Sequence, residues 1–180
     1  MTKKMKCPVS PLLLVAALLG MSTFASADTH FGLVYAPTYT LLSSNTGGFG
    51  AAGGGLMLDL GLGQATSLEI DALYQTKVIS TLSPTYADVG VALKFHLSPH
   101  FALSAGGYFD YLLSANSAIL TNTDYGLKAG AMIDIPAGSS FGFVVGANFK
   151  YALANVSPGG TINLNQVQGL VGIRFGGSHK

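Results

Sequence analysis

The histidines and the charged side chains are the groups in this sequence best suited to chemistry. A histidine beside a serine nucleophile supports acyl transfer, and histidines grouped with carboxylates can hold a metal ion. Charged residues can act as acid–base pairs, or they can form ion pairs that line a polar interior. The sequence has four histidines, which are His30, His96, His100 and His179. Which chemistry is possible depends on the elements that position these groups.

A glycine-rich run at residues 47–55 (GGFGAAGGG) has the composition of a phosphate-binding loop. Such a loop must lead into a helix, because the N–H groups of the first helical turn hold the phosphate. The residues after this run alternate as a strand does. We therefore interpret the run as small residues beside a loop, and we predict no cofactor and no metal.

The first 27 residues have the features of a secretory signal peptide. A basic segment containing Lys3, Lys4 and Lys6 precedes an apolar run at residues 11–21. This run is shorter than the roughly 20 residues that a transmembrane helix requires. Residues 25–27 (ASA) form a cleavage site with small residues at its first and last positions. We predict that residues 1–27 are a signal peptide and that residues 28–180 form one domain.

The composition of the mature part is unusual. Charged residues make up 9% of the chain, against about 25% in a typical soluble domain. Removal of the signal leaves 6 basic and 8 acidic residues, so no basic patch remains and nucleic acid is not a predicted partner. The only cysteine, Cys7, is lost with the signal. No mature segment has an apolar run long enough for a membrane helix, which leaves a closed barrel as the way to satisfy the backbone in lipid.

Apolar residues recur at every second position along the mature chain, as they do in strands with two different faces. The alternation predicts eight strands, at about residues 30–42, 49–61, 66–79, 85–97, 101–115, 123–135, 141–155 and 162–175. Strands of this length can cross a membrane at a tilt. The predicted fold class is all-β, an eight-stranded antiparallel up-and-down transmembrane β-barrel.

The charged residues of these strands all have the parity opposite to the apolar residues. A water-soluble barrel would carry its charges outside, whereas an apolar exterior and a polar interior are typical of a barrel in lipid. The predicted charge network in the lumen has members in both halves of the barrel. Those in the periplasmic half are Asp59, Glu69, Asp71, Lys94, Asp134 and Arg174, with His96 facing inward beside Lys94. Those in the outer half are Lys77, Asp88, Asp110, Asp124, Lys128 and Lys150.

Turns and aromatic residues predict the orientation. Compact turns at residues 61–65, 97–100 and 136–140 lie in the periplasm if the mature chain starts there, and short uncharged outer loops follow at about 43–48, 80–84, 116–122 and 156–160. Aromatic belts mark membrane interfaces. The outer belt contains Tyr39, Tyr74, Tyr111, Tyr125 and Tyr151. The periplasmic belt contains Phe31, Phe95, Phe101, Phe141, Phe143 and Phe175.

With this architecture, the sequence resembles the small eight-stranded outer-membrane barrels, the superfamily of the OmpA transmembrane domain and OmpX. The resemblance covers residues 28–175 and lies in the architecture, not in a residue signature. The last strand, residues 167–175 (VQGLVGIRF), looks like the terminal signal read by the barrel-assembly machinery, except for its glycine position and the five residues that follow it. The resemblance implies the outer membrane of a Gram-negative cell envelope, with the barrel-assembly machinery as partner during insertion.

Function follows from the lumen in this interpretation. An eight-stranded barrel has just enough room for its own side chains, so we predict a structural, porin-like barrel that contacts outer-membrane lipids as a monomer and is not an enzyme. The histidines map to the periplasmic side or the tail. A catalytic role would place His96 near Asp71 or Glu69, but we interpret it as a hydrogen-bonded lumen residue. The alternatives are a narrow channel for small solutes or ions, which many small inward residues would permit, and a surface-contact protein acting through its short outer loops.

Arg174 is the cation that the sequence predicts to be most important in the periplasmic half. Few other bases lie at that depth, and the last strand must close against the first. Its candidate partners are Asp59, Glu69, Asp71 and Asp134, among which the sequence does not choose.

Overall fold

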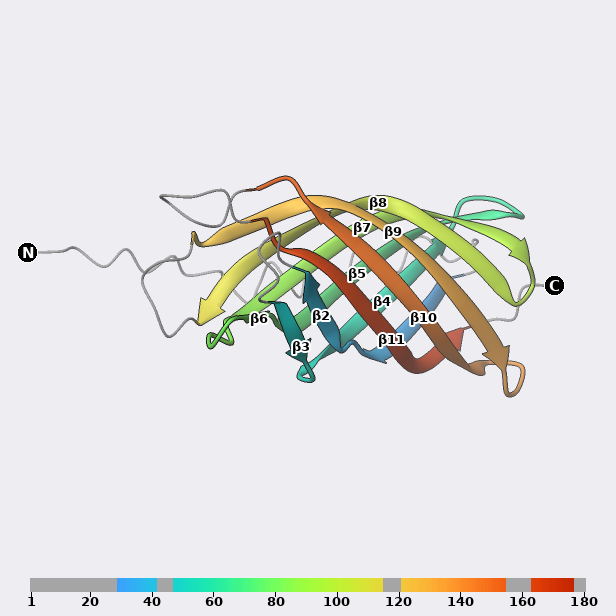
Figure 1. The fold of residues 1–180 in the computed structure, drawn as a ribbon. Helices are drawn as coiled ribbons and strands as arrows, with labels where there is room; N and C mark the ends of the chain where they lie inside the picture. The colour runs from blue at the N-terminus through green and yellow to red at the C-terminus, as the bar shows by residue number, and fades with distance from the viewer. Residues whose placement is uncertain (1–28, 42–46, 115–120, 155–162, 177–180) are drawn as a thin grey trace, which may run out of the picture.

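The protein is a closed antiparallel barrel of eight transmembrane strands, three of which are interrupted (Figure 1). The computed structural model describes residues 29–41, 47–114, 121–154 and 163–176. The uninterrupted strands are β7 (Thr85–Ser98), β8 (Phe101–Ser114), β9 (Thr123–Pro136), β10 (Phe141–Ala152) and β11 (Asn165–Gly176). The interrupted strands are β1 (Thr29–Tyr35) with β2 (Thr38–Leu41), β3 (Gly47–Gly50) with β4 (Gly53–Gly61), and β5 (Thr66–Thr76) with β6 (Val78–Ile79). The predicted fold class is confirmed.

Pairing of the first and last strands closes the barrel. Leu33 of β1 lies opposite Leu56 of β4 on one side and opposite Ile173 of β11 on the other. Closure pairs the backbone N–H and C=O groups that an open sheet would leave exposed at its edges. This is the arrangement that an apolar surface in lipid requires.

The register fixes the tilt of the strands. A path of directly opposed residues, followed once around the barrel from Thr29, returns to the same strand at Tyr39, a shift of ten residues (39 less 29). With ~3.3 Å per residue and ~4.8 Å between strands, this shift corresponds to a tilt of about 40°. The strands in Figure 1 are inclined to the long axis accordingly.

Three strands are interrupted, although the alternation predicts them as continuous. Pro37 lies between β1 and β2, where it has no N–H to donate, but its carbonyl accepts from Gly169 N at 2.8 Å. Ala52, between β3 and β4, accepts from Thr76 N at 2.9 Å. Lys77, between β5 and β6, donates its N–H to Pro84 O at 3.0 Å. Hydrogen bonds to neighbouring strands thus continue across the interruptions.

The predicted facing of the strands is confirmed except in β3, where Phe49 faces outward although the prediction for residues 49–61 puts the even-numbered residues outward. On β7, Leu93 is 47% exposed and its neighbour Ala92 only 2%. The same alternation occurs on β8, β9 and β10. The outer surface is therefore a wall of leucine, isoleucine, valine and aromatic side chains, as a barrel in lipid requires.

We name the two ends of the barrel by their connections. The turn end carries the predicted compact turns, which the structure places at residues 62–65, 99–100 and 137–140, together with Thr29 and Gly176. The opposite end is the loop end. The predicted loop at 43–48 is too long by two residues, because Gly47 and Gly48 pair with Ile79 and Val78.

Other predicted segments lie outside the described residues. These are the signal peptide and loop residues 43–46, 116–120 and 156–160, and they stay predictions. In the part of the chain that is described, no helix has the length and apolar character needed to cross a membrane.

Candidate functional site

At the turn end of the lumen, two cations contact three carboxylates. Arg174 Nη1 lies 3.1 Å from Asp134 Oδ2. Lys94 Nζ lies 2.7 Å from Asp59 Oδ2 and 3.5 Å from Glu69 Oε2. Of the four partners predicted for Arg174, the structure shows Asp134. Asp134 is on β9 and Arg174 is on β11, the two strands that flank β10. Lys94, not Arg174, is the cation with two acidic neighbours at this end.

Lys128 connects the two halves of the lumen. Its Nζ lies 2.8 Å from Glu69 Oε1 and also contacts Asp71. The sequence places Lys128 in the outer half and both carboxylates in the periplasmic half. The division into two levels does not limit pairing, because the long lysine side chain reaches across the levels. Further toward the loop end, Lys150 contacts Asp88.

The loop-end half contains the most enclosed pair of carboxylates. Lys77 Nζ lies 2.6 Å from Asp110 Oδ2 and 2.5 Å from Asp124 Oδ2, and all three side chains are fully buried. The ammonium group also lies 4.5 Å from the centre of the Tyr86 ring. Lys150 Nζ lies 5.1 Å from the ring centre of Tyr108. Aromatic faces at this distance stabilise a desolvated cation in addition to its carboxylates.

Neutral polar side chains tie this cluster to the opposite wall. Gln75 Nε2 donates to Asp110 Oδ1 at 2.7 Å, and Gln75 Oε1 accepts from Gln168 Nε2 at 3.2 Å. Gln168 Oε1 in turn accepts from Asn148 Nδ2 at 3.2 Å. The sequence analysis missed this relay because it followed charges only. The signal that could have found it is the inward parity of these amides.

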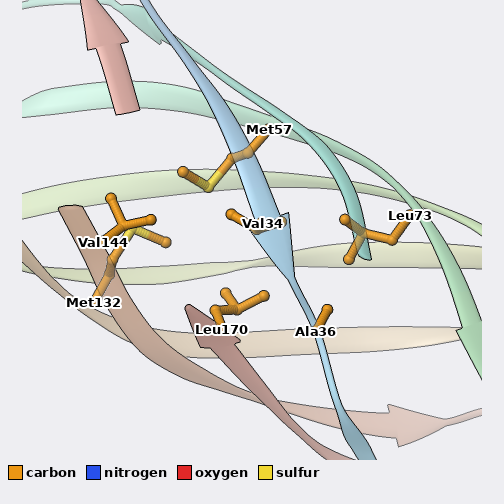
Figure 2. Packing of buried hydrophobic residues seen from close by; sticks show 7 residues of the cluster. All are labelled: Val34, Ala36, Met57, Leu73, Met132, Val144 and Leu170. Carbon is orange, nitrogen blue, oxygen red and sulfur yellow. The ribbon is translucent and has the colours of Figure 1, made fainter. Parts of the chain in front are cut away.

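The lumen also contains an apolar cluster, which corrects the expectation of an interior that is polar throughout. In Figure 2, Val34, Val144 and Leu170 lie close to the two methionines, Met57 and Met132. These side chains come from β1, β10, β11, β4 and β9. Charges enter the lumen mainly from β4 through β10, while β1 carries none and β11 only Arg174. The charged wall of the lumen is thus formed mainly by β4 through β10, and the apolar cluster takes side chains from β4, β9 and β10 as well as from β1 and β11.

Inward-facing glycines make room for these side chains. A Cβ added at Gly90 would lie 2.5 Å from Asp71 Oδ1, and one at Gly130 would lie 2.1 Å from Asn148 Oδ1. Met57, Met132 and Tyr108 are at most 5% exposed. The small inward residues, which the sequence could assign either to a wet channel or to packing, serve packing at these positions.

His96 is hydrogen-bonded in the lumen, at its turn end. Its Nε2 lies 3.1 Å from Ser67 Oγ. Ser67 is 2% exposed, so its hydroxyl group is shielded from solvent. Among the described residues, no group of three or more His, Cys, Asp or Glu side chains is arranged to hold a metal ion.

The balance of charges decides what the lumen can do. Five cations face seven carboxylates, and every one of them has an oppositely charged partner within 4 Å. Ions removed from water need such partners, because the desolvation cost of an unpaired charge is several kcal/mol. The arrangement therefore suits a filled interior with a small excess of negative charge.

The fold can be compared with known structures. No protein-family model matches the sequence, and no curated protein matches it. Neisserial surface protein A has a TM-score of 0.61 at 12% identity, over 82% of this chain and 96% of that one. OprG from Pseudomonas aeruginosa has a TM-score of 0.55 at 10% identity, over 83% of this chain and 96% of that one. The N-terminal β-barrel domain of Pseudomonas aeruginosa OprF has a TM-score of 0.53 at 12% identity, over 84% of this chain and 99% of that one. The chain therefore has the fold of the small eight-stranded outer-membrane β-barrels, as its sequence resemblance predicts.

Proposed function

We propose that the protein is a structural barrel of the bacterial outer membrane, without catalytic activity and without a conducting lumen. The apolar exterior supports the membrane location, since the outward side chains of every strand suit lipid. The similarity of fold to outer-membrane barrels supports the same location.

The observation that carries the proposal is the complete pairing of buried charge in the lumen. Lys77, Lys94, Lys128 and Lys150 are each at most 2% exposed, and each contacts at least one carboxylate. The apolar cluster around Met132 lies against the charged wall, where Lys94 Nζ approaches Met132 Sδ at 3.2 Å. A conducting path would have to separate these pairs, and breaking a buried pair typically costs about 3–5 kcal/mol.

Planar-bilayer conductance of the refolded mature protein tests this proposal. The wild-type barrel should give no steady current. A variant with Lys77→Ala and Lys128→Ala removes two ammonium groups that bridge carboxylates, so it should conduct and should prefer cations. A wild-type barrel with a steady ohmic current would contradict the proposal and favour the narrow channel.

A further inference from the structure

Three aspartates lie side by side in the loop-end half of the lumen. Asp88 of β7 is directly opposite Asp110 of β8, and Asp110 is directly opposite Asp124 of β9. Each of the three is at most 1% exposed. We call these three residues the aspartate row. Carboxylates at directly opposed strand positions repel each other, and burial strengthens the repulsion because little water screens it.

The groups around the aspartate row supply one positive charge too few. Lys77 contacts two members of the row, and Lys150 contacts the third. The next cation toward the turn end, Lys128, is shared by Glu69 and Asp71. Strands β2, β3 and β6 contain no charged residue, and β11 carries its one charged residue at the turn end. Three carboxylates therefore face two ammonium groups.

Two oxygens of the aspartate row have no donor among the described residues. The ammonium groups contact the Oδ2 atoms of the three aspartates. Gln75 Nε2 donates to Asp110 Oδ1 at 2.7 Å. Asp88 Oδ1 and Asp124 Oδ1 are buried and have no hydrogen bond. A buried acceptor without a donor is unfavourable, so these two oxygens mark where the row lacks a partner.

Two tyrosines beside the aspartate row also have unused hydroxyl groups. Tyr86 and Tyr108 are 0% and 5% exposed, and neither hydroxyl has a hydrogen-bond partner among the described residues. Their ring centres lie 4.5 Å and 6.0 Å from Lys77 Nζ. A neutral hydroxyl can donate to a carboxylate or accept from a carboxyl group. It cannot supply the missing positive charge.

The turn end lacks one positive charge as well, but it has a histidine to supply it. Three carboxylates share two lysines there. His30 of β1 lies directly opposite Asp59 of β4, and an imidazole can take up a proton near neutral pH. Within the described residues, no histidine lies in the loop-end half of a strand. The aspartate row must therefore obtain its missing charge in another way.

We propose that the aspartate row binds one proton at neutral pH, on Asp88 Oδ1 or Asp124 Oδ1. The bound proton leaves two carboxylates facing two ammonium groups, and the new O–H group donates to a neighbouring oxygen. Adjacent carboxylates share a proton because both cannot ionise at short distance. A proton also needs no cavity and no ligand set. The proposal goes beyond the structural role, but it rests on a closed lumen, since bulk water would screen the row.

Infrared spectroscopy of the refolded mature protein in lipid vesicles tests the proposal, because a protonated carboxyl group absorbs apart from a carboxylate. At neutral pH the wild-type barrel should show a protonated-carboxyl band that shifts in heavy water. Asp124→Asn should lose the intensity of one carboxyl group, because its amide is neutral and supplies the donor that the proton supplied. Asp134→Asn is the matched control at the turn end, where Asp134 pairs with Arg174, and it should keep the band.

The pH dependence of stability gives a second measurement. Unfolded aspartates ionise at about pH 4. The folded barrel then binds one proton more than the unfolded chain, so its stability falls as the pH rises. Between about pH 6 and 7, the ratio of folded to unfolded wild-type protein should fall by about tenfold relative to that of Asp124→Asn. The histidines cancel in this comparison because both proteins contain them.

Three results would overturn the proposal: a wild-type barrel without the protonated-carboxyl band, a band that Asp124→Asn leaves unchanged, and a stability that follows sodium or potassium concentration instead of pH. The last result would assign the missing charge to a metal cation. Asp88→Asn neutralises the same row and carries the same predictions, so the test stands if Asp124→Asn does not fold. A steady current through the wild-type barrel would instead contradict the proposed function. In a barrel that does not conduct, the infrared result concerns the proton alone.

Discussion

Lys128 illustrates how much of the lumen is decided by single side chains. It contacts Glu69 and Asp71, which are two residues apart on β5 and face inward together. One ammonium group therefore compensates two carboxylates that would otherwise repel each other in a desolvated space. The same arrangement recurs with Lys77 between Asp110 and Asp124.

Lys94 should contribute more to stability than Arg174, in contrast to the expectation from the sequence. Lys94→Met removes the partner of Asp59 inside the barrel, where the lysine side chain is 1% exposed. We expect a loss of about 3–5 kcal/mol in the free energy of unfolding. Arg174→Met should cost less, because the Arg174 side chain is 11% exposed and pairs with Asp134 only. Urea unfolding in lipid vesicles compares the two variants, and an equal or greater loss for Arg174→Met would contradict the ranking.

A methyl group at Gly90 should destabilise the barrel, because the carboxylate of Asp71 occupies the space that the added Cβ would need. Gly90→Ala would place its Cβ against Asp71 and push that side chain away from Lys128. Overpacking of this kind costs about 1–3 kcal/mol. Gly138→Ala is the control, since a Cβ at that turn position meets nothing within 4 Å. Thermal unfolding in detergent should separate the two variants, and similar midpoints would mean that the lumen is loosely packed.

Two substitutions on neighbouring residues of β7 test which face of the strand is in lipid and which is in the lumen. Leu93→Arg places a charge on the outward face, near the middle of the strand, and should cost about 2–4 kcal/mol. Ala92→Ser adds a hydroxyl group on the inward face beside polar groups and should cost much less. Unfolding by urea in vesicles measures both. Equal penalties would show that the two faces do not differ in environment.

The strands could be predicted from the sequence because alternation at period two survives along most of the chain. The bounds of β7 and β9 differ by one residue from the predicted ones. The interruptions were not predicted. Pro37 preserves the alternation while it breaks the backbone geometry, whereas at residues 51–52 the alternation itself changes, since Phe49 of β3 and Leu56 of β4 both face outward. The sequence also did not predict the individual ion pairs, since a lysine can reach carboxylates one to three strands away.

The apolar cluster shows a different limit of sequence reasoning. Three residues of the cluster have inward parity, namely Val34, Val144 and Leu170. In the sequence they stand next to outward-facing residues, so they cannot be distinguished from a continuous apolar stretch. An inward position accepts an apolar side chain where other apolar side chains meet it inside the lumen. That condition depends on which strands face each other across the lumen, and it becomes visible only when the barrel closes.

At the scale of the whole molecule, the barrel encloses its charged side chains in the lumen and so keeps them away from the membrane. The outward surface of the described strands is apolar or aromatic, and the interior holds the ion pairs and the amide relay. The seven carboxylates exceed the five cations, which would favour cations in any path that opened. The central claim is thus that the lumen is filled and that its lysines are sealed from water.

Amine modification tests that claim most directly, because it needs no substitution. The folded barrel in detergent is treated with a small water-soluble acetylating reagent, and each lysine is quantified by mass spectrometry against urea-unfolded protein. Lys77, Lys94, Lys128 and Lys150 are at most 2% exposed, so we predict that all four stay unmodified until the barrel unfolds. Modification of these four lysines in the folded barrel at rates near those of the unfolded chain would contradict a filled lumen.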